Sequence, residues 1–270
     1  MQLPQIGLQH PRISQVRAVL HHRAAQHRDL LVAEGRWAHE VLLDLAVPIE
    51  LLLWCPPAAA APDPAHRLTG RLAAQATAAY QISPRVLARL TERDQPDGLV
   101  SLVRLPRWEP DAVPLPPAAL VLVADGIEIP GNLGTLLRTL DGCGGDCLLL
   151  TNRRTRLTHP KVFRSSRGMN LRLPVVEFEE PVAAVEWLRR HRFTVFLATT
   201  EAAAVPYRQV DFPPRTALVV GNERSGISRP WQEYGFGEVT VPMLGATDSL
   251  NVGVSASILL YEARSQLSRL

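Results

Sequence analysis

Short apolar runs alternate with longer segments of mixed polarity through residues 119–270. The runs are β-branched or leucine-rich at almost every position, which is typical of strands buried on both faces of a parallel sheet. We expect strands at Leu120–Ala124, Cys147–Leu150, Pro174–Glu177, Thr194–Ala198, Ala217–Val220 and Glu238–Val241. We expect helices at Leu133–Gly142, near Lys161–Arg167, at Pro181–Arg190, at Ile227–Tyr234 and from Ser249 to Arg264. This alternation predicts an α/β domain whose parallel sheet is covered by helices on both sides.

The first hundred residues show the same alternation over a smaller span. The expected strands are Leu30–Ala33, Ile49–Trp54, Ala78–Ile82 and Leu99–Val103, with helices that include residues 12–28 and Arg36–Leu45. They predict a small α/β domain over residues 1–103. It carries no cluster of titratable side chains that indicates chemistry, so we expect it to serve in recognition. Five prolines in residues 104–118 predict a stiff linker to the second domain, 119–270.

Composition limits the class of protein. A hydrophobic content of 46% with 20% charged residues describes a globular chain with a sizeable core. The three cysteines, Cys55, Cys143 and Cys147, lack the spacing of a disulfide framework or a zinc site, which favours a reducing compartment and no metal. No signal peptide opens the chain, and no apolar run reaches the ~20 residues of a membrane span. We therefore expect a cytoplasmic protein with no membrane partner.

The positive charge is carried almost entirely by arginine. The net charge is +3, and Lys161 is the sole lysine. Arginine suits phosphate recognition, although an arginine bias can equally reflect the base composition of a genome. The expected helix at 12–28 has a basic face that either contacts RNA or is simply solvated. The candidate RNA contacts on it are Arg12, Arg17, Arg23 and Arg28.

Polar side chains gather where three of the expected strands end. Asn132 stands near a helix N-terminus with Arg138 six residues later, and Glu223 lies in a tight loop between glycines 221 and 226. Ser249 and Asn251 open the last helix, for which Asp248 and Ser249 are the expected N-caps. The carboxyl ends of parallel strands share one edge of a sheet, so these side chains are expected to converge.

A dinucleotide-binding fingerprint is missing. The nearest glycine cluster, Gly142–Gly145, follows a helix and precedes a strand, the reverse of what phosphate binding requires. We interpret it as a helix C-cap and turn.

Three sequence motifs together resemble one protein family. Pro130-Gly-Asn-Leu-Gly with Arg138, the loop Gly-Asn-Glu-Arg-Ser-Gly, and Val-Pro-Met followed by Asp-Ser-Leu-Asn-Val are similar to the three motifs of the SpoU (TrmH) family. Members of that family are S-adenosyl-L-methionine-dependent RNA 2′-O-ribose methyltransferases. Gly126-Ile-Glu-Ile replaces the more usual Asp-Pro of the first motif, and this region is closest to the thiostrepton-resistance branch. The N-terminal domain resembles the substrate-binding domain of the general family.

The resemblance implies a fold and a set of site residues. The fold is the SPOUT type, an α/β domain with a deep trefoil knot, assembled as a homodimer whose active site uses both subunits. The implied catalytic residues are Asn132, Arg138, Glu223, Ser249 and Asn251. The implied cofactor-binding residues are Leu197, Ala198, Thr199, Gly221, Asn222, Val241, Met243, Leu250 and Asn251, and Arg167 is an implied RNA contact.

Arg138 is the implied residue nearest the reacting hydroxyl and its adjacent phosphate. The family mechanism is often written with this arginine as the base. Because the pKa of a guanidinium is above ~12, positioning and electrostatic stabilisation are the roles we favour.

The function expected is methylation of a ribose 2′-hydroxyl in RNA, with 23S ribosomal RNA favoured. A tRNA substrate is the alternative within the same class. Two alternatives belong to other classes. One is an RNA-binding protein that has lost catalysis. The other is a nicotinamide-dependent oxidoreductase, and the missing glycine fingerprint disfavours it. The sequence names neither the methylated nucleotide nor the purpose of the modification, whether housekeeping or antibiotic resistance.

Overall fold

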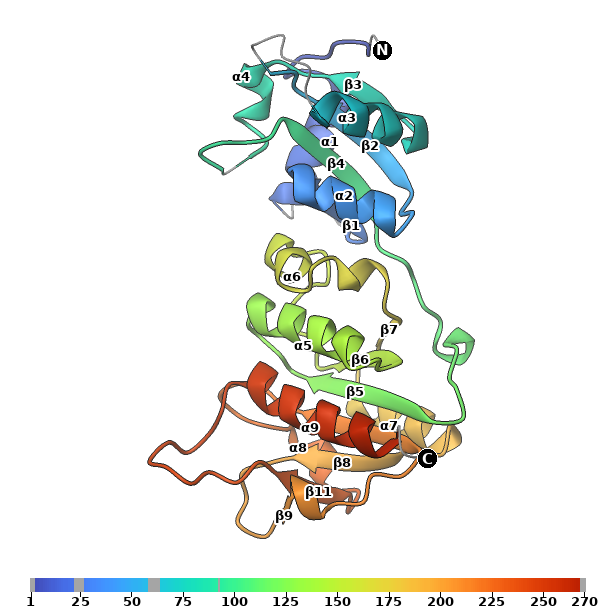
Figure 1. Cartoon of the computed structure of the whole chain (residues 1–270), viewed down its shortest axis with the longest axis vertical. Coiled ribbons are helices and arrows are strands. Elements are labelled where there is room, and N and C mark those ends of the chain that lie inside the picture. Colours follow the sequence, from blue (N-terminus) through green and yellow to red (C-terminus); the bar gives the residue numbers. More distant parts are fainter. Residues whose placement is uncertain (1–2, 22–26, 58–63, 92, 268–270) are drawn as a thin grey trace. The chain divides into compact units, whose positions relative to one another are not determined.

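The computed structural model describes residues 3–21, 27–57, 64–91 and 93–267. The chain divides into two compact units, Met1–Pro106 and Arg107–Leu270 (Figure 1). Within the described residues, no helix is long and apolar enough to cross a membrane.

The first unit is a four-stranded mixed sheet with helices. Its sheet has the order β1-β4-β2-β3, in which β4 is antiparallel to both neighbours and β3 is parallel to β2. The strands are β1 (Leu30–Glu34), β2 (Ile49–Trp54), β3 (Ala79–Gln81) and β4 (Leu99–Arg104). The helices are α1 (Pro11–Leu20), α2 (Arg36–Asp44), α3 (Pro64–Gln75) and α4 (Pro84–Leu87). The expected strands are therefore confirmed to within two residues at each end.

Helix α1 is shorter than the predicted helix over residues 12–28. Its buried stripe consists of Ile13, Val16 and Val19, and the helix ends at Leu20 with His21 as its C-cap. Residues 22–26 of the predicted helix lie outside the described residues. The prediction is confirmed over residues 12–20, and the described residues 27–29 form a turn before β1.

The second unit is built on a seven-stranded sheet in which every neighbouring pair is parallel. Its order is β7-β6-β5-β10-β8-β11-β9. The strands are β5 (Ala119–Asp125), β6 (Cys147–Thr151), β7 (Val175–Glu177), β8 (Thr194–Ala198), β9 (Val205–Pro206), β10 (Arg215–Val220) and β11 (Gly237–Thr240). All six predicted strands are present, and β9 is an additional two-residue edge strand.

Helices cover both faces of this sheet. They are α5 (Pro130–Gly142), α6 (Pro160–Ser165), α7 (Pro181–Arg190), α8 (Arg229–Gln232) and α9 (Val252–Leu267). Alternate residues of β5 point to opposite faces, so Leu120 and Leu122 pack with α5, α6 and α9. Val121 and Val123 pack with α7 and α8 on the other face. The predicted two-sided sheet is confirmed.

Some helix boundaries differ from those predicted. Helix α5 begins three residues early, because Pro130 at its start has the backbone angle of a first helical turn and no N–H to satisfy. Helix α8 is only four residues long, since Ile227 and Ser228 belong to the preceding loop. The glycine cluster after α5 is a C-terminal turn as predicted, with Gly144 at a φ of 70° and Gly145 N–H donating to the Leu140 carbonyl at 2.7 Å.

Residues 107–118 belong to the second unit by their packing. Val113 is buried in its core, and Trp108 and Leu115 pack against that core. Apolar side chains between the prolines therefore hold this stretch against the sheet. The three cysteines are free and buried, as expected for small apolar side chains.

The strand order defines where a ligand can enter. From β5 the chain proceeds outward through β6 to β7, and it then returns to build β8, β10 and β11 on the other side of β5. The connections after β5 and β10 therefore run in opposite directions along the sheet. A reversal of this kind leaves a crevice at the carboxyl ends of the strands.

The terminal helix α9 packs closely along α5. A Cβ placed on Gly253 would lie 2.8 Å from Cγ2 of Thr135, and the hydroxyls of Thr139 and Ser257 are 3.2 Å apart. The small residues of α9 thus permit the close approach expected from the sequence. Threading of this segment through a knot stays a prediction of the family resemblance.

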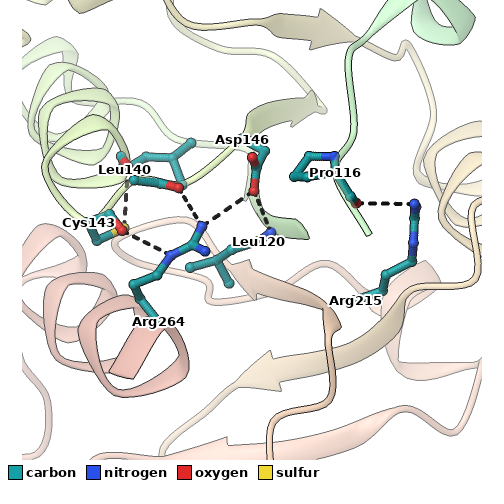
Figure 2. Close-up of polar contacts among 8 residues, drawn as sticks. Pro116, Leu120, Leu140, Cys143, Asp146, Arg215 and Arg264 are labelled. Atoms are coloured by element: carbon teal, nitrogen blue, oxygen red, sulfur yellow. Dashed lines mark hydrogen bonds and ion pairs between the residues drawn. The ribbon is translucent and has the colours of Figure 1, made fainter. Parts of the chain in front are cut away.

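Arg264 fixes the far end of α9 (Figure 2). Its Nε donates to the Cys143 carbonyl at 3.0 Å, and its guanidinium also donates to the Gly144 carbonyl and lies 3.4 Å from Asp146. Asp146 in turn accepts a hydrogen bond from the backbone N–H of Leu120 at 2.8 Å. One side chain therefore joins α9, the turn after α5 and the first residues of β5.

Candidate functional site

A cavity of about 680 Å³ opens at the carboxyl ends of β8, β10 and β11, beside the start of α9. Its volume falls in the range of about 300–1,000 Å³ that small-molecule sites occupy. Every residue predicted to bind the cofactor lines it: Leu197, Ala198, Thr199, Gly221, Asn222, Val241, Met243, Leu250 and Asn251. So do four of the five predicted catalytic residues, namely Asn132, Glu223, Ser249 and Asn251.

Glu223 is the hub of the polar side of this cavity. Its Oε1 accepts hydrogen bonds from Nδ2 of Asn132 at 2.8 Å and from the Ile129 N–H at 3.2 Å. Its Oε2 accepts from the Glu128 N–H at 3.1 Å. The carboxylate therefore binds the open N-terminus of α5, where backbone donors lack partners within the helix.

These contacts keep Glu223 ionised. Partial burial raises the pKa of the carboxyl, but the hydrogen bonds from Asn132 and from backbone N–H groups outweigh it, and the pKa lies below its ordinary value. Both oxygens are occupied as acceptors. An ionised carboxylate with a lowered pKa is a weak base, so the geometry assigns Glu223 to positioning.

Asn251 extends the network to the last helix. Its Nδ2 donates to Oδ1 of Asn132 at 3.1 Å, so Asn132 is bound on both sides of its amide. Its Oδ1 accepts from the Gly253 N–H at 2.9 Å, and its carbonyl accepts the first helical hydrogen bond, from Ser255. Asn251, Asn132 and Glu223, from three separate motifs, thus form one chain of hydrogen bonds that we name the amide relay.

Asn251 is therefore the N-cap of α9, and the prediction of Asp248 or Ser249 as the cap is wrong. The physical reason is register: only Asn251 places a side-chain oxygen at the first free N–H groups of this helix. Ser249 is exposed at the cavity, with its hydroxyl 3.4 Å from Oδ1 of Asp248.

The loop that carries Glu223 is held by its own backbone. Asn222 and Gly226 exchange two backbone hydrogen bonds of 2.9 Å, and Oδ1 of Asn222 accepts from the Arg224 N–H at 2.9 Å. A Cβ on Gly221 would lie 2.2 Å from the backbone of Gly226, so only glycine fits there. This tight loop, which the sequence predicted, aims Glu223 at α5.

Asp125, which the sequence analysis did not select, supports the same loop. It is buried at the end of β5 and accepts hydrogen bonds from the Thr151 hydroxyl at 2.8 Å, the Asn152 amide at 2.7 Å and the Ser228 N–H at 2.7 Å. It thereby ties the loops after β5, β6 and β10 together. The available signal was a carboxylate placed directly after six apolar strand residues.

Arg138 lies outside the cavity. It is exposed on α5, and its side chain makes no hydrogen bond or ion pair with the described residues. The other predicted RNA contacts are not among the cavity-lining residues either: Arg167 follows α6 with a φ of 57°, Arg12 and Arg17 are on α1, and Arg28 lies in the turn before β1. Arg23 lies outside the described residues.

The cavity wall combines apolar and polar groups. Leu197, Val241 and Leu250 offer apolar surface, and Thr199, Asn222 and the exposed strand-end backbone offer hydrogen-bonding groups. Apolar walls with a few polar groups are typical of small-molecule sites. Within the described ranges, no three His, Cys, Asp or Glu side chains cluster in a way that could hold a metal ion.

The chain is similar to known proteins over most of its length. A model of the SpoU rRNA methylase family matches residues 119–261. A tRNA/rRNA methyltransferase of Synechocystis is 34% identical over 74% of this chain and 72% of its own length. A 23S rRNA (guanosine(2553)-2′-O)-methyltransferase of Bacillus subtilis is 31% identical over 68% and 72%. The structure of the SpoU methyltransferase AviRb from Streptomyces viridochromogenes, in complex with AdoMet, matches 96% of this chain and 98% of its own with a TM-score of 0.80 and 25% identity.

Proposed function

The chain belongs to the SpoU rRNA methylase family, and on this premise we propose that it transfers a methyl group from S-adenosylmethionine to a ribose 2′-hydroxyl of ribosomal RNA. The amide relay is the observation that carries the proposal, because it unites three distant motifs at one ligand-sized cavity. The Bacillus subtilis relative, named for 23S rRNA, favours that substrate.

The cavity fits the cofactor in size and in the chemistry of its walls. Gly221 lies in the cavity wall, and a Cβ there would collide with the Gly226 backbone at 2.2 Å, so the tight loop that shapes this wall requires glycine. Leu197, Val241 and Leu250 would hold the adenine, and the polar groups near Asn222 would hold the ribose or the amino-acid end. When bound, the sulfonium supplies a methyl group that is already strongly electrophilic.

The protein must therefore align a poor nucleophile and assist loss of its proton. Asn132 is held in one orientation by Glu223 and Asn251, and it presents a fixed amide at the cavity wall. Such preorganised dipoles stabilise developing charge without reorganisation during the reaction. Glu223 positions Asn132 and the start of α5, and Ser249 lies at the rim where RNA would enter.

Arg138 completes this site from a second copy of the chain. It lies outside the cavity of its own protomer, on the exposed face of α5. Val254 and Tyr261 on the neighbouring helix α9 are 48% and 55% exposed, and their spacing of seven residues places both on one face of that helix. We propose a homodimer through α5 and α9, in which Arg138 of the partner subunit reaches the reacting ribose and its phosphate.

The remaining parts of the proposal follow the family resemblance. Unit Met1–Pro106 recognises RNA, the C-terminal segment is threaded in a trefoil knot, and the protein acts in the cytoplasm without a metal. A tRNA substrate is the second candidate, and it is supported by the name of the Synechocystis relative, which includes both tRNA and rRNA.

Methyl transfer with labelled S-adenosylmethionine tests the function. We expect label in unmodified 23S rRNA transcripts as 2′-O-methylnucleotide, and little in bulk tRNA. Label in tRNA alone would replace the ribosomal substrate by the alternative. Thermal stabilisation by S-adenosylmethionine is expected and by NAD is not; the reverse result would refute the cofactor assignment.

A further inference from the structure

A second group of cations lies on the loop between β6 and α6 and on α6 itself. Arg153 is paired with Glu177 at 2.9 Å. Four further cations are exposed, and their side chains make no hydrogen bond or ion pair with any described residue: Arg154, Arg156, Lys161 and Arg164. We name these four residues the basic ridge.

The ridge is carried by a loop that is held in place. The Thr155 hydroxyl, between two of its arginines, donates to the Glu128 carbonyl at 2.6 Å. Asn152 donates to Asp125 at 2.7 Å and to the Ser228 hydroxyl at 3.1 Å, and Asn170 donates to the Leu157 carbonyl at 3.0 Å. A loop fixed at three points presents its charges with little ordering cost when a ligand binds.

The same contacts place the ridge beside the cavity. Glu128, which accepts from Thr155, also donates its N–H to Glu223, and Ile129 next to it lines the cavity. The Lys161 side chain runs over Gly131, where an added Cβ would lie 3.4 Å from its Cε. Gly131 directly precedes Asn132 of the amide relay.

The charge of this surface is only partly balanced. Glu177 pairs with Arg153, and Glu128 and Glu223 are acidic side chains of the adjoining strand-end loops. Arginine forks with no protein partner match phosphate oxygens in geometry and charge.

Resting on the proposed function, we propose that the basic ridge binds backbone phosphates of the RNA that flank the nucleotide to be methylated. It supplies affinity and register independent of base identity, while the bases are read elsewhere. It deepens the proposed function by assigning a phosphate-binding surface outside the residues of the three motifs.

The test compares two double variants of the full chain that remove equal charge. R154Q/R156Q alters the ridge. R190Q/R192Q alters two exposed arginines at the end of α7, which packs on the opposite face of the sheet. Filter binding of an in vitro 23S rRNA transcript is measured across salt concentrations, and thermal shift reports folding and S-adenosylmethionine binding.

We expect R154Q/R156Q to weaken RNA binding roughly tenfold and to lower the slope of log affinity against log salt by about 1.5, as for two lost phosphate contacts. K161Q should lower the slope by about half as much. The cofactor affinity and melting temperature should stay as in wild type, and R190Q/R192Q should bind RNA as wild type does.

The phosphate-binding role of the ridge would be refuted if R154Q/R156Q left RNA affinity and the salt slope unchanged. An equal loss of RNA affinity in both double variants would refute it too. RNA binding is measured without turnover, so a failure of the ridge proposal can be distinguished from a failure of the proposed methyltransferase function. A wild type that binds the transcript through the ridge but transfers no methyl group to any RNA would refute the proposed function alone.

Discussion

The two sheets of this chain differ in where they keep their polar side chains. In the first unit, His39 is completely buried between α2 and the sheet; its Nδ1 donates to the Gly35 carbonyl and its Nε2 accepts from the Ser101 hydroxyl, both at 2.8 Å. In the second unit, the amide relay lies at the carboxyl ends of the strands and faces a cavity. Both networks have hydrogen-bond partners within the protein, and the second also lines the cavity.

This difference indicates that the His39 network serves stability and that the amide relay serves the reaction. A buried polar pair with all its partners inside the protein fixes one arrangement of helix and sheet. A polar group at a strand end keeps part of its surface for a substrate. We therefore expect substitutions in the amide relay to affect turnover, and substitutions at His39 to affect folding.

The largest effect is expected for Arg138→Ala. If Arg138 stabilises the reacting groups as proposed, its loss should lower methyl transfer by roughly 10³-fold, while S-adenosylmethionine affinity stays within about twofold. Turnover and isothermal titration measure the two. Turnover at the wild-type rate would refute the role of this arginine.

The proposed homodimer gives a second test of Arg138. Mixed dimers of Arg138→Ala with Glu223→Gln should regain up to about a quarter of wild-type activity, because random pairing makes half of the dimers mixed and each of these carries one intact site. No gain on mixing would show that each protomer uses its own arginine.

Glu223→Gln should lower the turnover number roughly 10²-fold, because an amide cannot accept from Asn132 and two backbone N–H groups as the carboxylate does. Glu186→Gln, on the exposed face of α7, removes the same charge as a control. If Glu223→Gln had the same turnover number as Glu186→Gln, the proposed positioning role of Glu223 would be refuted.

The pH dependence of stability follows from the lowered pKa of Glu223. Its carboxylate contributes stability that is complete above the ordinary glutamate pKa of about 4.3 and is lost as the pH falls through the lower folded value. Denaturant unfolding of wild type and Glu223→Gln should therefore converge only at acid pH.

The first unit should respond to pH in a different window. Burial lowers the pKa of His39 to about 4, and the Gly35 and Asp97 interactions only partly oppose this. Because the unfolded chain binds the proton more readily, stability is complete above about pH 6.5 and falls toward pH 4. We expect a loss of about 2 kcal/mol between about pH 7.5 and pH 5 in denaturant unfolding of this unit. His39→Gln should flatten this dependence and leave S-adenosylmethionine affinity unchanged; an unaltered pH profile in the variant would contradict the assignment.

The smallest effect is expected for Arg264→Gln. The guanidinium is a quarter exposed, and its loss leaves the Cys143 and Gly144 carbonyls near water, so we expect about 1 kcal/mol of destabilisation. Thermal unfolding measures it. A shift as large as that of a core substitution would show that Arg264 does more than fasten the helix.

Sequence reasoning recovered the strands because each is an apolar run bounded by turn residues, and strand ends in a parallel sheet converge. It could not give the end of α1, because neither proline nor glycine follows the buried stripe to stop a helix before β1. It missed Asp125, whose partners Thr151, Asn152 and Ser228 lie on other strands' loops. It selected the cavity residues by motif, but the cap at Asn251 and the position of Arg138 outside the cavity depend on three-dimensional packing.

The attachment of α9 also bears on the order in which the chain folds during its synthesis. Asn251 and Arg264 bind groups that precede them by about 120 residues, and such distant pairs close slowly. Every strand of the parallel sheet leaves the ribosome before this helix does. The part of the cavity wall formed by Asn251, Val252 and Ser255 is therefore the last to be synthesised, so the cavity stays open on this side until α9 is in place.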